Sequence, residues 1–293
     1  MSDAARPNER AVAMTSSEST GRERVAMRDE YAGLADVYDR MARDPGIRVF
    51  YREWRQALLA AAKARGVRPR VLVDLACGTG NSTVPWSRHR GWLVVGVDRS
   101  AAMLKQARRK STTVRWYRQD VMDLSIREQA DLVTCHFDAL NHILRDRDLQ
   151  RVFANVAGLL RQGGLFQFDL NTGHWLRWLN GRDKLFRAGR DCVTSQNEFD
   201  ATSGVATFHQ WWFLRRGRLY ERRHIAVRER AYSDAVVRVM LRISGMRLLN
   251  VTVQRRVDGK PARKLYLATK APTRRHDDQS RRAGPRRASR ADR

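Results

Sequence analysis

Residues Val71 to Gly80 read Val-Leu-Val-Asp-Leu-Ala-Cys-Gly-Thr-Gly, an apolar run closed by a glycine turn. The run predicts a buried strand, and the turn predicts the start of a helical segment. Glycine is needed where a ligand must lie against bare backbone, because a Cβ atom would block its approach. Asp74, four residues before Gly78, favours a ligand with an ammonium group and disfavours a pyrophosphate.

Two common phosphate-binding loops do not fit this stretch. The dinucleotide-binding fingerprint needs a third glycine, and Thr83 occupies that position. The loop of nucleoside triphosphatases needs the pattern G-x-x-x-x-G-K-[ST], which the sequence lacks. Both kinds of phosphate-binding loop are therefore excluded.

Four more apolar runs follow the same pattern along the chain, with amphipathic helical segments between them. The five runs cover residues 71–75, 92–97, 114–117, 131–135 and 165–170. Continuous apolar strands that alternate with helices predict an α/β fold with a parallel sheet covered on both faces. We expect a Rossmann-like, seven-stranded, mostly parallel sheet that ends in an antiparallel hairpin.

Carboxylates stand at the ends of three consecutive strands. Asp98 ends the second run, 18 residues after Gly80, and Asp120 follows the third run. A carboxylate about 20 residues beyond the glycine turn suits the two hydroxyls of a ribose. Asp120 is placed to accept the amino group of an adenine. Open α/β sheets bind ligands at the carboxyl ends of their strands, so these aspartates predict one binding site.

The remaining segments predict an inserted β meander and two flexible ends. Three β-rich segments joined by turns form the meander, and a hairpin closes the core near the C-terminus. We expect a disordered leader over 1–27, a ligand-binding core over 28–171, a β-rich lid over 172–230, the rest of the core over 231–272 and a disordered basic tail over 273–293.

Composition places few further limits on function. The net charge of +26 is carried mostly by arginine and is scattered along the chain, so a nucleic-acid partner is not the favoured interpretation. Three cysteines show no metal-ligand spacing, and we expect no metal site. The first 27 residues lack the apolar stretch of a secretory signal, and no run is long enough to span a bilayer. These features favour a cytoplasmic protein without a membrane partner, as a monomer or homodimer.

At this point the motifs resemble those of class I methyltransferases, which use S-adenosylmethionine (SAM). Asp74 to Asn81 resembles their first motif, Gly96 to Ser100 their second, Gln119 to Val121 their third, and Asp131 to Cys135 their fourth. The resemblance extends over about residues 31–271. Within the family, the N-terminal tyrosines and the insert are similar to those of aminosugar N,N-dimethyltransferases and, more loosely, glycine N-methyltransferase.

The resemblance implies which residues bind the cofactor and which face the methyl acceptor. The implied cofactor residues are Asp74, Ala76, Cys77, Gly78, Gly80, Asp98, Arg99, Met103, Asp120, Val121 and Phe137. Tyr31 and His142 match residues that lie near the acceptor amine in the aminosugar enzymes, with His142 as the candidate base. The residues expected to line the acceptor pocket are Tyr38, Asn141, Asn171, Trp175 and Tyr232. Asp138 and Asn141 depart from those relatives, which have small serine or glycine residues there.

The expected activity is methyl transfer from SAM to a nitrogen or oxygen of a small molecule, with S-adenosylhomocysteine as the other product. Two alternatives remain open. An RNA or protein methyltransferase would use the basic surface, although the D/N-P-P-Y/F motif of base-methylating enzymes is absent after the fourth strand, where Cys135 to Asp138 contain no proline. The other alternative is a non-catalytic regulator that binds SAM.

Overall fold

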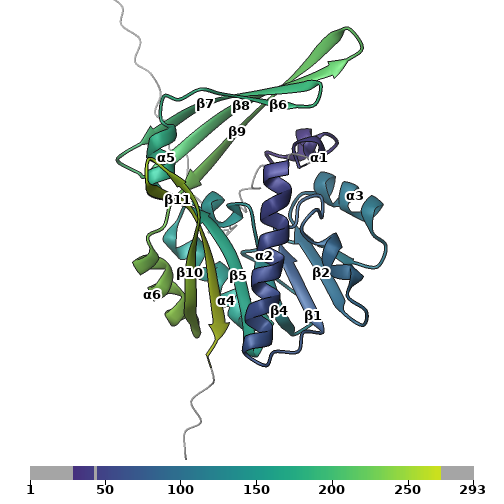
Figure 1. Ribbon diagram of the computed structural model, residues 1–293, viewed down its shortest axis with the longest axis vertical. Coiled ribbons are helices and arrows are strands. Elements are labelled where there is room, and N and C mark those ends of the chain that lie inside the picture. The colour runs from purple at the N-terminus through teal and green to yellow at the C-terminus, as the bar shows by residue number, and fades with distance from the viewer. Residues whose placement is uncertain (1–28, 43–44, 272–293) are drawn as a thin grey trace, which may run out of the picture.

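The residues that the computed structural model describes, 29–42 and 45–271, form two β-sheets (Figure 1). The larger sheet has the order β10-β11-β5-β4-β1-β2-β3. Strands β1 to β5 are parallel to one another, whereas β11 and β10 run antiparallel. The predicted α/β class, with a mostly parallel seven-stranded sheet and a terminal hairpin, is confirmed. The smaller sheet is antiparallel, in the order β6-β7-β8-β9.

The larger sheet consists of β1 (Val71–Leu75), β2 (Leu93–Asp98), β3 (Arg115–Arg118), β4 (Ala130–Cys135), β5 (Leu160–Asn171), β10 (Met246–Val257) and β11 (Lys260–Lys270). The smaller consists of β6 (Lys184–Ala188), β7 (Asp191–Asp200), β8 (Val205–Arg216) and β9 (Leu219–Arg230). The helices are η1 (Ala32–Leu34), α1 (Tyr38–Met41), α2 (Pro45–Ala64), η2 (Val84–Arg88), α3 (Ala101–Lys110), η3 (Ala139–His142), α4 (Asp146–Leu159), α5 (Gly173–Leu179) and α6 (Asp234–Ile243). None of these described helices is long and apolar enough to cross a membrane.

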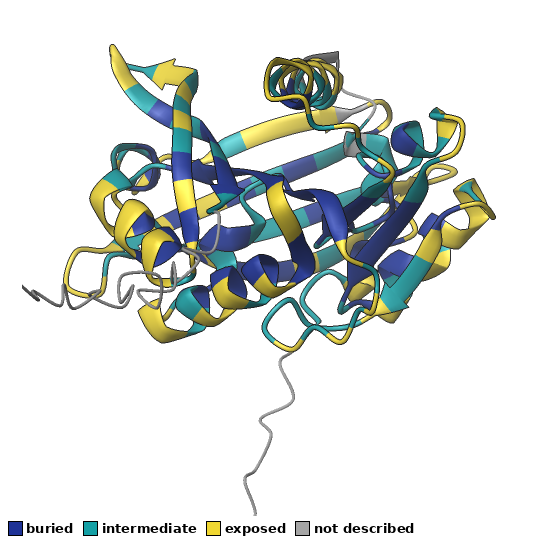
Figure 2. Ribbon diagram, turned by 90° about the horizontal axis from the view of Figure 1, so that it is seen from below, coloured by how far each residue is buried: buried dark blue, intermediate teal, exposed yellow. Residues whose placement is uncertain are grey.

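The larger sheet is buried on both faces, as its apolar strands predict. All six residues of β4 are buried, and β4 is the middle strand of the sheet. Figure 2 shows buried residues, in dark blue, on the inner strands of the molecule. One face packs against α4 and α6 through residues such as Phe153 and Leu241. The other packs against α2 through Leu58 and against Trp86. This double coverage explains why the strands read as continuous apolar runs.

The polar residues before several helices fix where those helices begin. The Ser100 hydroxyl accepts the backbone N–H of Met103 at the start of α3, and Ser233 does the same for α6. Thr172 caps α5 in the same way, directly after β5. Each cap satisfies a backbone donor that would otherwise lack a partner. The caps therefore make the chain leave the sheet at the strand ends, beside the candidate site.

One face of the smaller sheet packs against the N-terminal segment, residues 29–42, as well as against the larger sheet. Leu34 and Val37 lie in one apolar cluster with β-strand residues such as Trp212. Trp211, the preceding residue, lies on the opposite face and stacks on His224, as alternation along a strand requires. The N-terminal segment and the smaller sheet therefore share a core of their own (Figure 1).

Parts of the fold differ from what the sequence patterns predict. Residues 31–41 do not form one helix but η1 followed by the one-turn α1, because the interior Gly33 disfavours a continuous helix. The fifth strand, expected over residues 165–170, begins earlier, at Leu160, because the start of the strand already pairs with β4. The elements α5 and β6 were not predicted, because they are too short to show a clear sequence period. The expected leader and basic tail lie outside the described residues.

A buried asparagine joins three parts of the fold beside the candidate site. The Asn141 side chain donates to the backbone carbonyls of Asn171 and Arg230, at 3.1 and 2.9 Å. Its oxygen accepts the Asn171 N–H at 2.9 Å. Asn141 therefore connects η3 to the end of β5 and to the end of β9, and it fixes where η3 lies.

Replacing Asn141 with alanine should lower the free energy of unfolding by roughly 1–3 kcal/mol, because buried backbone groups lose their partners. Urea denaturation followed by circular dichroism measures the change. Asn250→Ala is the matched control, since the Asn250 side chain is exposed and bonds only Thr252. Equal stability of the two variants would contradict a junction at Asn141.

Candidate active site

One cavity opens at the carboxyl ends of the parallel strands, under the N-terminal segment. One wall is formed by residues 29–38, and the other by the loops that follow β1, β2, β3 and β4. It is lined by Asp29, Tyr31, Tyr38, Ala76, Gly78, Asp98, Arg99, Ser100, Met103, Gln119, Asp120, Val121, His136, Phe137, Ala139, His142 and Ile143. The cavity lies where the strand order reverses between β1 and β4, the place where open α/β sheets bind ligands.

Asp98 and Gly78 form the floor of the cavity. One oxygen of Asp98 accepts the Gly78 N–H at 2.7 Å, and the other accepts the Ser100 N–H at 2.8 Å. Gly78 has φ +54°, and a Cβ atom there would enter open space rather than protein. Burial raises the pKa of the Asp98 carboxyl in spite of these two hydrogen bonds. Each oxygen keeps a lone pair that can accept a ligand hydroxyl.

The neighbouring wall is apolar with one carboxylate. Met103, from α3, is almost fully buried and lines the cavity together with Val121. One oxygen of Asp120 accepts the Met122 N–H at 2.8 Å, which holds the carboxylate in a turn. An apolar slot with an acceptor at its end suits a flat base that carries an amino group.

Asp74 does not line the cavity, contrary to expectation. Its carboxylate is buried and accepts hydrogen bonds from three hydroxyls: Ser82 at 2.7 Å, Thr83 at 2.6 Å and Thr134 at 2.7 Å. These three hydrogen bonds hold the glycine loop against β1 and β4. The Asp74 carboxylate therefore positions the loop.

Cys77 and Gly80 do not line the cavity either. Cys77 is buried beneath the loop, where burial raises the pKa of its thiol. A Cβ atom on Gly80 would lie 2.6 Å from the Trp116 ring, and a Cβ atom on Gly96 would lie 2.3 Å from it. Glycine is required at Gly80 because of the tryptophan, not because of a ligand.

Tyr31 and His142, the expected acceptor residues, meet in the same cavity. The Tyr31 hydroxyl lies 3.5 Å from Nε2 of His142, and the two rings pack edge to face. His142 Nδ1 lies 3.0 Å from the Arg228 carbonyl. A carbonyl oxygen can only accept, so Nδ1 carries the proton and Nε2 presents a lone pair. Tyr38 packs on Tyr31 and completes this end of the cavity.

Titration of these side chains follows from their burial. Burial lowers the pKa of His142, although Asp138 opposes the shift. Burial raises the pKa of Tyr38 to about 12 and also raises the pKa of Tyr31. At neutral pH the site therefore holds a neutral imidazole beside two protonated phenols.

The four other residues expected to line the acceptor pocket serve the structure instead. Asn141 forms the junction described above, and Asn171 donates to Glu229 at 2.8 Å. Trp175 packs in the core of the smaller sheet. The Tyr232 hydroxyl donates to the Ile143 carbonyl. All four are buried, and none of them borders the cavity, because the hydrogen bonds and packing of each turn it into the protein interior.

Sequence reasoning missed residues that follow the strand ends and one acidic cluster. His136 and Gln119 line the cavity directly after β4 and β3, so their position at strand ends is a signal that could have identified them. Glu229 and Arg263 approach Asp138 from β9 and β11. No local signal marks these two, because they come near the site only through tertiary folding.

Gly78→Ala and Gly80→Ala should have opposite effects. Gly78→Ala should fold with a small loss of stability but weaken SAM, the ligand that the resemblance implies, because the new methyl group projects into the cavity. Gly80→Ala should cost roughly 1–3 kcal/mol of folding free energy, because the methyl group overlaps Trp116. Thermal unfolding and titration calorimetry with SAM measure both quantities. A reversed pattern would contradict the assigned roles of the two glycines.

Asp98→Ala should weaken SAM binding by roughly 1.5–3 kcal/mol, the contribution of charge-assisted hydrogen bonds. Calorimetry on the purified chain measures the affinity. Asp123→Ala serves as the control, since its carboxylate lies on the surface, outside the cavity. Unchanged affinity in Asp98→Ala would mean that the ribose does not lie on this carboxylate.

Comparison with known proteins agrees with this geometry. Residues 72–164 match a family model described as a methyltransferase domain. A Geobacillus protein that is named provisionally as a methyltransferase is 29% identical over 147 residues, which are 48% of this chain and 58% of that protein. A dTDP-3-amino-3,6-dideoxy-α-D-glucopyranose N,N-dimethyltransferase of Streptomyces fradiae is 28% identical over 46% of this chain and 52% of its own length. The chain thus spans little more than half the length of these two relatives.

A solved structure matches over most of the chain. The SAM-dependent methyltransferase of Clostridium acetobutylicum is 27% identical, with a TM-score of 0.72, and the match covers 83% of this chain and 99% of that one. The cavity fits SAM on chemical grounds: Asp98 keeps free lone pairs for ribose hydroxyls, Met103 offers an apolar wall, and Gly78 leaves open space. In fold, cavity and sequence the chain is thus similar to class I SAM-dependent methyltransferases.

Proposed function

We propose that this protein transfers a methyl group from SAM to a nitrogen or oxygen nucleophile of a small molecule. One observation carries the proposal: the same cavity is lined by Gly78, Asp98 and Met103 and by Tyr31 and His142. Residues suited to a nucleoside and residues suited to a nucleophile therefore face the same space. Such an arrangement is what a group-transfer enzyme requires.

SAM supplies an electrophilic methyl group on a sulfonium, so the chain needs only to bind and align the two reactants. Asp98 would hold the ribose, Asp120 with Met103 the adenine, and the backbone at Gly78 the part next to the sulfur. Positioning of this kind contributes roughly 7–11 kcal/mol to lowering a barrier. A general base adds about 10²–10⁴-fold, or roughly 3–5 kcal/mol. Alignment is thus the larger effect.

His142 is the side chain suited to remove a proton from the nucleophile. Its Nδ1–H donates to the Arg228 carbonyl, so Nε2 is free to accept a proton on the cavity side. Its lowered pKa keeps the imidazole neutral at pH 7. The Tyr31 hydroxyl, 3.5 Å from Nε2, is placed to orient the same nucleophile. The pair would act on the acceptor, opposite the nucleoside end.

The N-terminal segment and the smaller sheet would form a lid over this cavity. Asp36 pairs with Arg223 of β9 at 2.6 Å, and Arg40 pairs with Asp191 of β7 at 2.5 Å. On the other side, Asp39 accepts the Thr79 hydroxyl of the glycine loop at 2.5 Å. The segment therefore connects the sheet above to the loop below, an arrangement that can exclude water during transfer.

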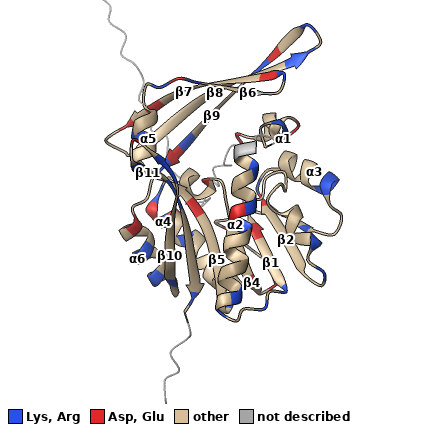
Figure 3. Cartoon of the chain, viewed as in Figure 1, with Lys and Arg blue, Asp and Glu red and all other residues tan. Residues whose placement is uncertain are grey.

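A small molecule is the favoured acceptor for two reasons. The Streptomyces relative is named for an aminosugar substrate, which supports an acceptor of that size. The Lys and Arg residues in the view of Figure 3 lie on helices and strands of both sheets rather than along one track. A nucleic-acid partner would call for a continuous basic surface. An RNA or protein acceptor is the second outcome that the experiment below separates.

Incubation with methyl-labelled SAM and a metabolite extract should place label in small molecules, detected by mass spectrometry. The rate should fall at acidic pH, once the pH drops below the lowered pKa of His142 and the imidazole is protonated. His142→Ala should lose at most about 10⁴-fold in rate while SAM affinity stays unchanged.

His224→Ala, at an exposed position of the smaller sheet, serves as the histidine control and should keep full activity. Label that enters RNA or protein instead would contradict a small-molecule acceptor. SAM binding without transfer to any fraction would support a regulator instead of an enzyme.

A further inference from the structure

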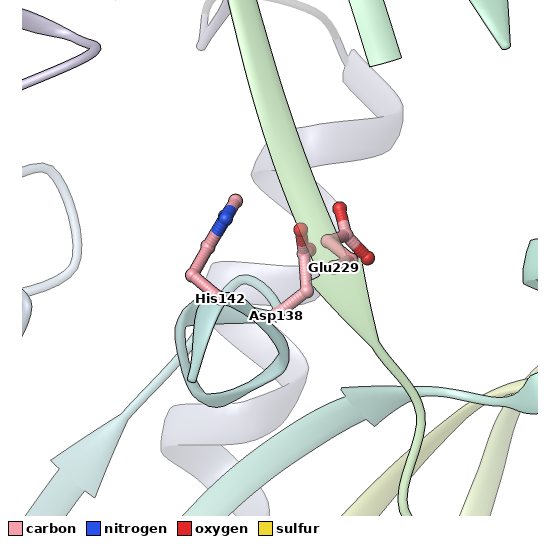
Figure 4. Close-up of side chains that lie close together, drawn as sticks. All are labelled: Asp138, His142 and Glu229. Atoms are coloured by element: carbon pink, nitrogen blue, oxygen red, sulfur yellow. The ribbon is translucent and has the colours of Figure 1, made fainter. Parts of the chain in front are cut away.

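The loop that follows β4 has an unusual backbone. Phe137 and Asp138 are neighbours, and their φ angles of +59° and +50° lie in the left-handed region that residues other than glycine rarely adopt. Such residues persist only where the surrounding structure enforces their conformation, often near functional sites. The loop leads into η3, and Figure 4 shows the side chains of Asp138 and His142 projecting from this short helix and its start. The conformation of the loop therefore decides where the proposed base lies.

Two side chains from the neighbouring strands form a clamp on this loop: Asp169 of β5 and Arg263 of β11. Oδ2 of Asp169 accepts the Asp138 N–H at 3.1 Å. The same oxygen accepts a guanidinium N–H of Arg263 at 2.9 Å, and a second N–H of Arg263 donates to the Asp138 carboxylate. The guanidinium also lies over the Phe137 ring, 5.9 Å from its centroid. The clamp therefore contacts the loop at its backbone, its carboxylate and its ring.

The clamp borders the loop but not the cavity. Asp169 is fully buried, and neither it nor Arg263 lines the cavity. Phe137 and His142, which precede and end the strained part of the chain, both line it. Phe137 is expected beside the cofactor and His142 beside the acceptor. A change in the loop would therefore displace one side chain for each reactant.

The clamp is not explained by stability alone. Oδ1 of Asp169 is buried and has no hydrogen-bond partner among the described residues. Burial raises the pKa of Asp169 to about 6, although the guanidinium of Arg263 opposes the shift, so the group is mainly ionised at neutral pH. Replacing a buried ion pair with apolar residues often leaves stability unchanged or raises it. The geometry that the pair imposes on the loop is therefore the better explanation for it.

We propose that Asp169 and Arg263 are positioning residues for methyl transfer, an inference that rests on the proposed function. They hold the left-handed turn at Phe137 and Asp138, and the turn fixes both the Phe137 ring and the direction of η3. His142, at the end of η3, is thereby aligned with the acceptor. Neither positioning residue contacts a reactant, so no proton passes through it.

The first test observes the loop without catalysis. Asp169→Asn removes the charge and keeps the size of the side chain. The full chain is labelled with ¹⁵N at its histidines, saturated with S-adenosylhomocysteine and examined by NMR, with His142 assigned from the signal that disappears in His142→Gln. Native His142 donates from Nδ1 to the Arg228 carbonyl. In Asp169→Asn its two nitrogen signals should move towards the average of the two tautomers, because η3 is released.

The second readout is the rate of label transfer from saturating methyl-labelled SAM to the metabolite extract. Asp169→Asn should lower this rate by roughly 10- to 100-fold, because a displacement of about 1 Å can cost about 10²-fold. The affinity for S-adenosylhomocysteine, measured by calorimetry, should change by a smaller factor, since Asp98 and Gly78 keep their hydrogen bond. A general loss of folded protein would lower both quantities together.

Asp131→Asn is the matched control for a buried ion pair. Asp131 accepts two backbone N–H groups and pairs with Arg161 at 2.8 Å, but it lies near the start of β4, away from the cavity. This variant should lose thermal stability, yet keep the His142 signals and the transfer rate. Equal effects of the two variants on signals and rate would show that Asp169 has only a structural role.

A second substitution tests the strained turn itself. Glycine adopts positive φ angles readily, so Asp138→Gly should make the turn independent of the clamp. In that background Asp169→Asn should lower the rate by less than about threefold, a coupling that a double-mutant cycle measures. The double variant also answers the question if Asp169→Asn alone does not fold. Independent, additive losses would overturn the inference, as would unchanged His142 signals and rate in Asp169→Asn.

Failure of this inference differs from failure of the proposed function. A native chain that transfers label to no small molecule would refute the proposed function, whereas the His142 signals need no acceptor and would still test the clamp. A native chain that transfers label, with an Asp169→Asn variant that keeps the full rate, would refute the positioning role alone.

Discussion

The buried carboxylate of Asp74 is the constraint on which the candidate site depends. It lies on β1, beside the central strand β4, and accepts three hydroxyl hydrogen bonds, two from the glycine loop and one from Thr134 on β4. A buried carboxylate is tolerated only when such donors surround it. The loop must therefore fold back over β1, and Gly78 is carried to where its N–H meets Asp98 on β2. One desolvated charge thus sets the geometry of three neighbouring strand ends.

Much of the fold follows from local pattern, whereas the chemistry of the acceptor end does not. The run from Val71 to Leu75 was placed correctly because its signal is complete within a few residues. The prediction that Asp98 and Asp120 share a site depended only on strand ends meeting at one edge of a parallel sheet, and both residues line the cavity. Such rules act at the level of the backbone, so the sequence alone is enough to apply them.

The directions in which side chains point could not be predicted from the sequence. Asp74 and Gly80 belong to the recognised motif, yet one is turned towards three hydroxyls and the other faces Trp116. In the sequence, Glu229 is one polar residue of a strand in which polar and apolar residues alternate. The register of β9 on β8 decides on which face of the sheet it lies. Its neighbour in space, Asp138, is 91 residues away in the chain. Only packing of the smaller sheet on the core determines that they meet.

The same packing brings the smaller sheet into contact with the surroundings of His142. The Arg228 carbonyl on β9 fixes which nitrogen of His142 is protonated, and the next residue, Glu229, lies close to Asp138 and His142. Asn141 ties the end of β9 to η3, which carries His142. Movement of the sheet away from the core would remove the hydrogen bond that sets the tautomer. The tautomer of His142 and the position of the smaller sheet are therefore coupled through the backbone of one strand.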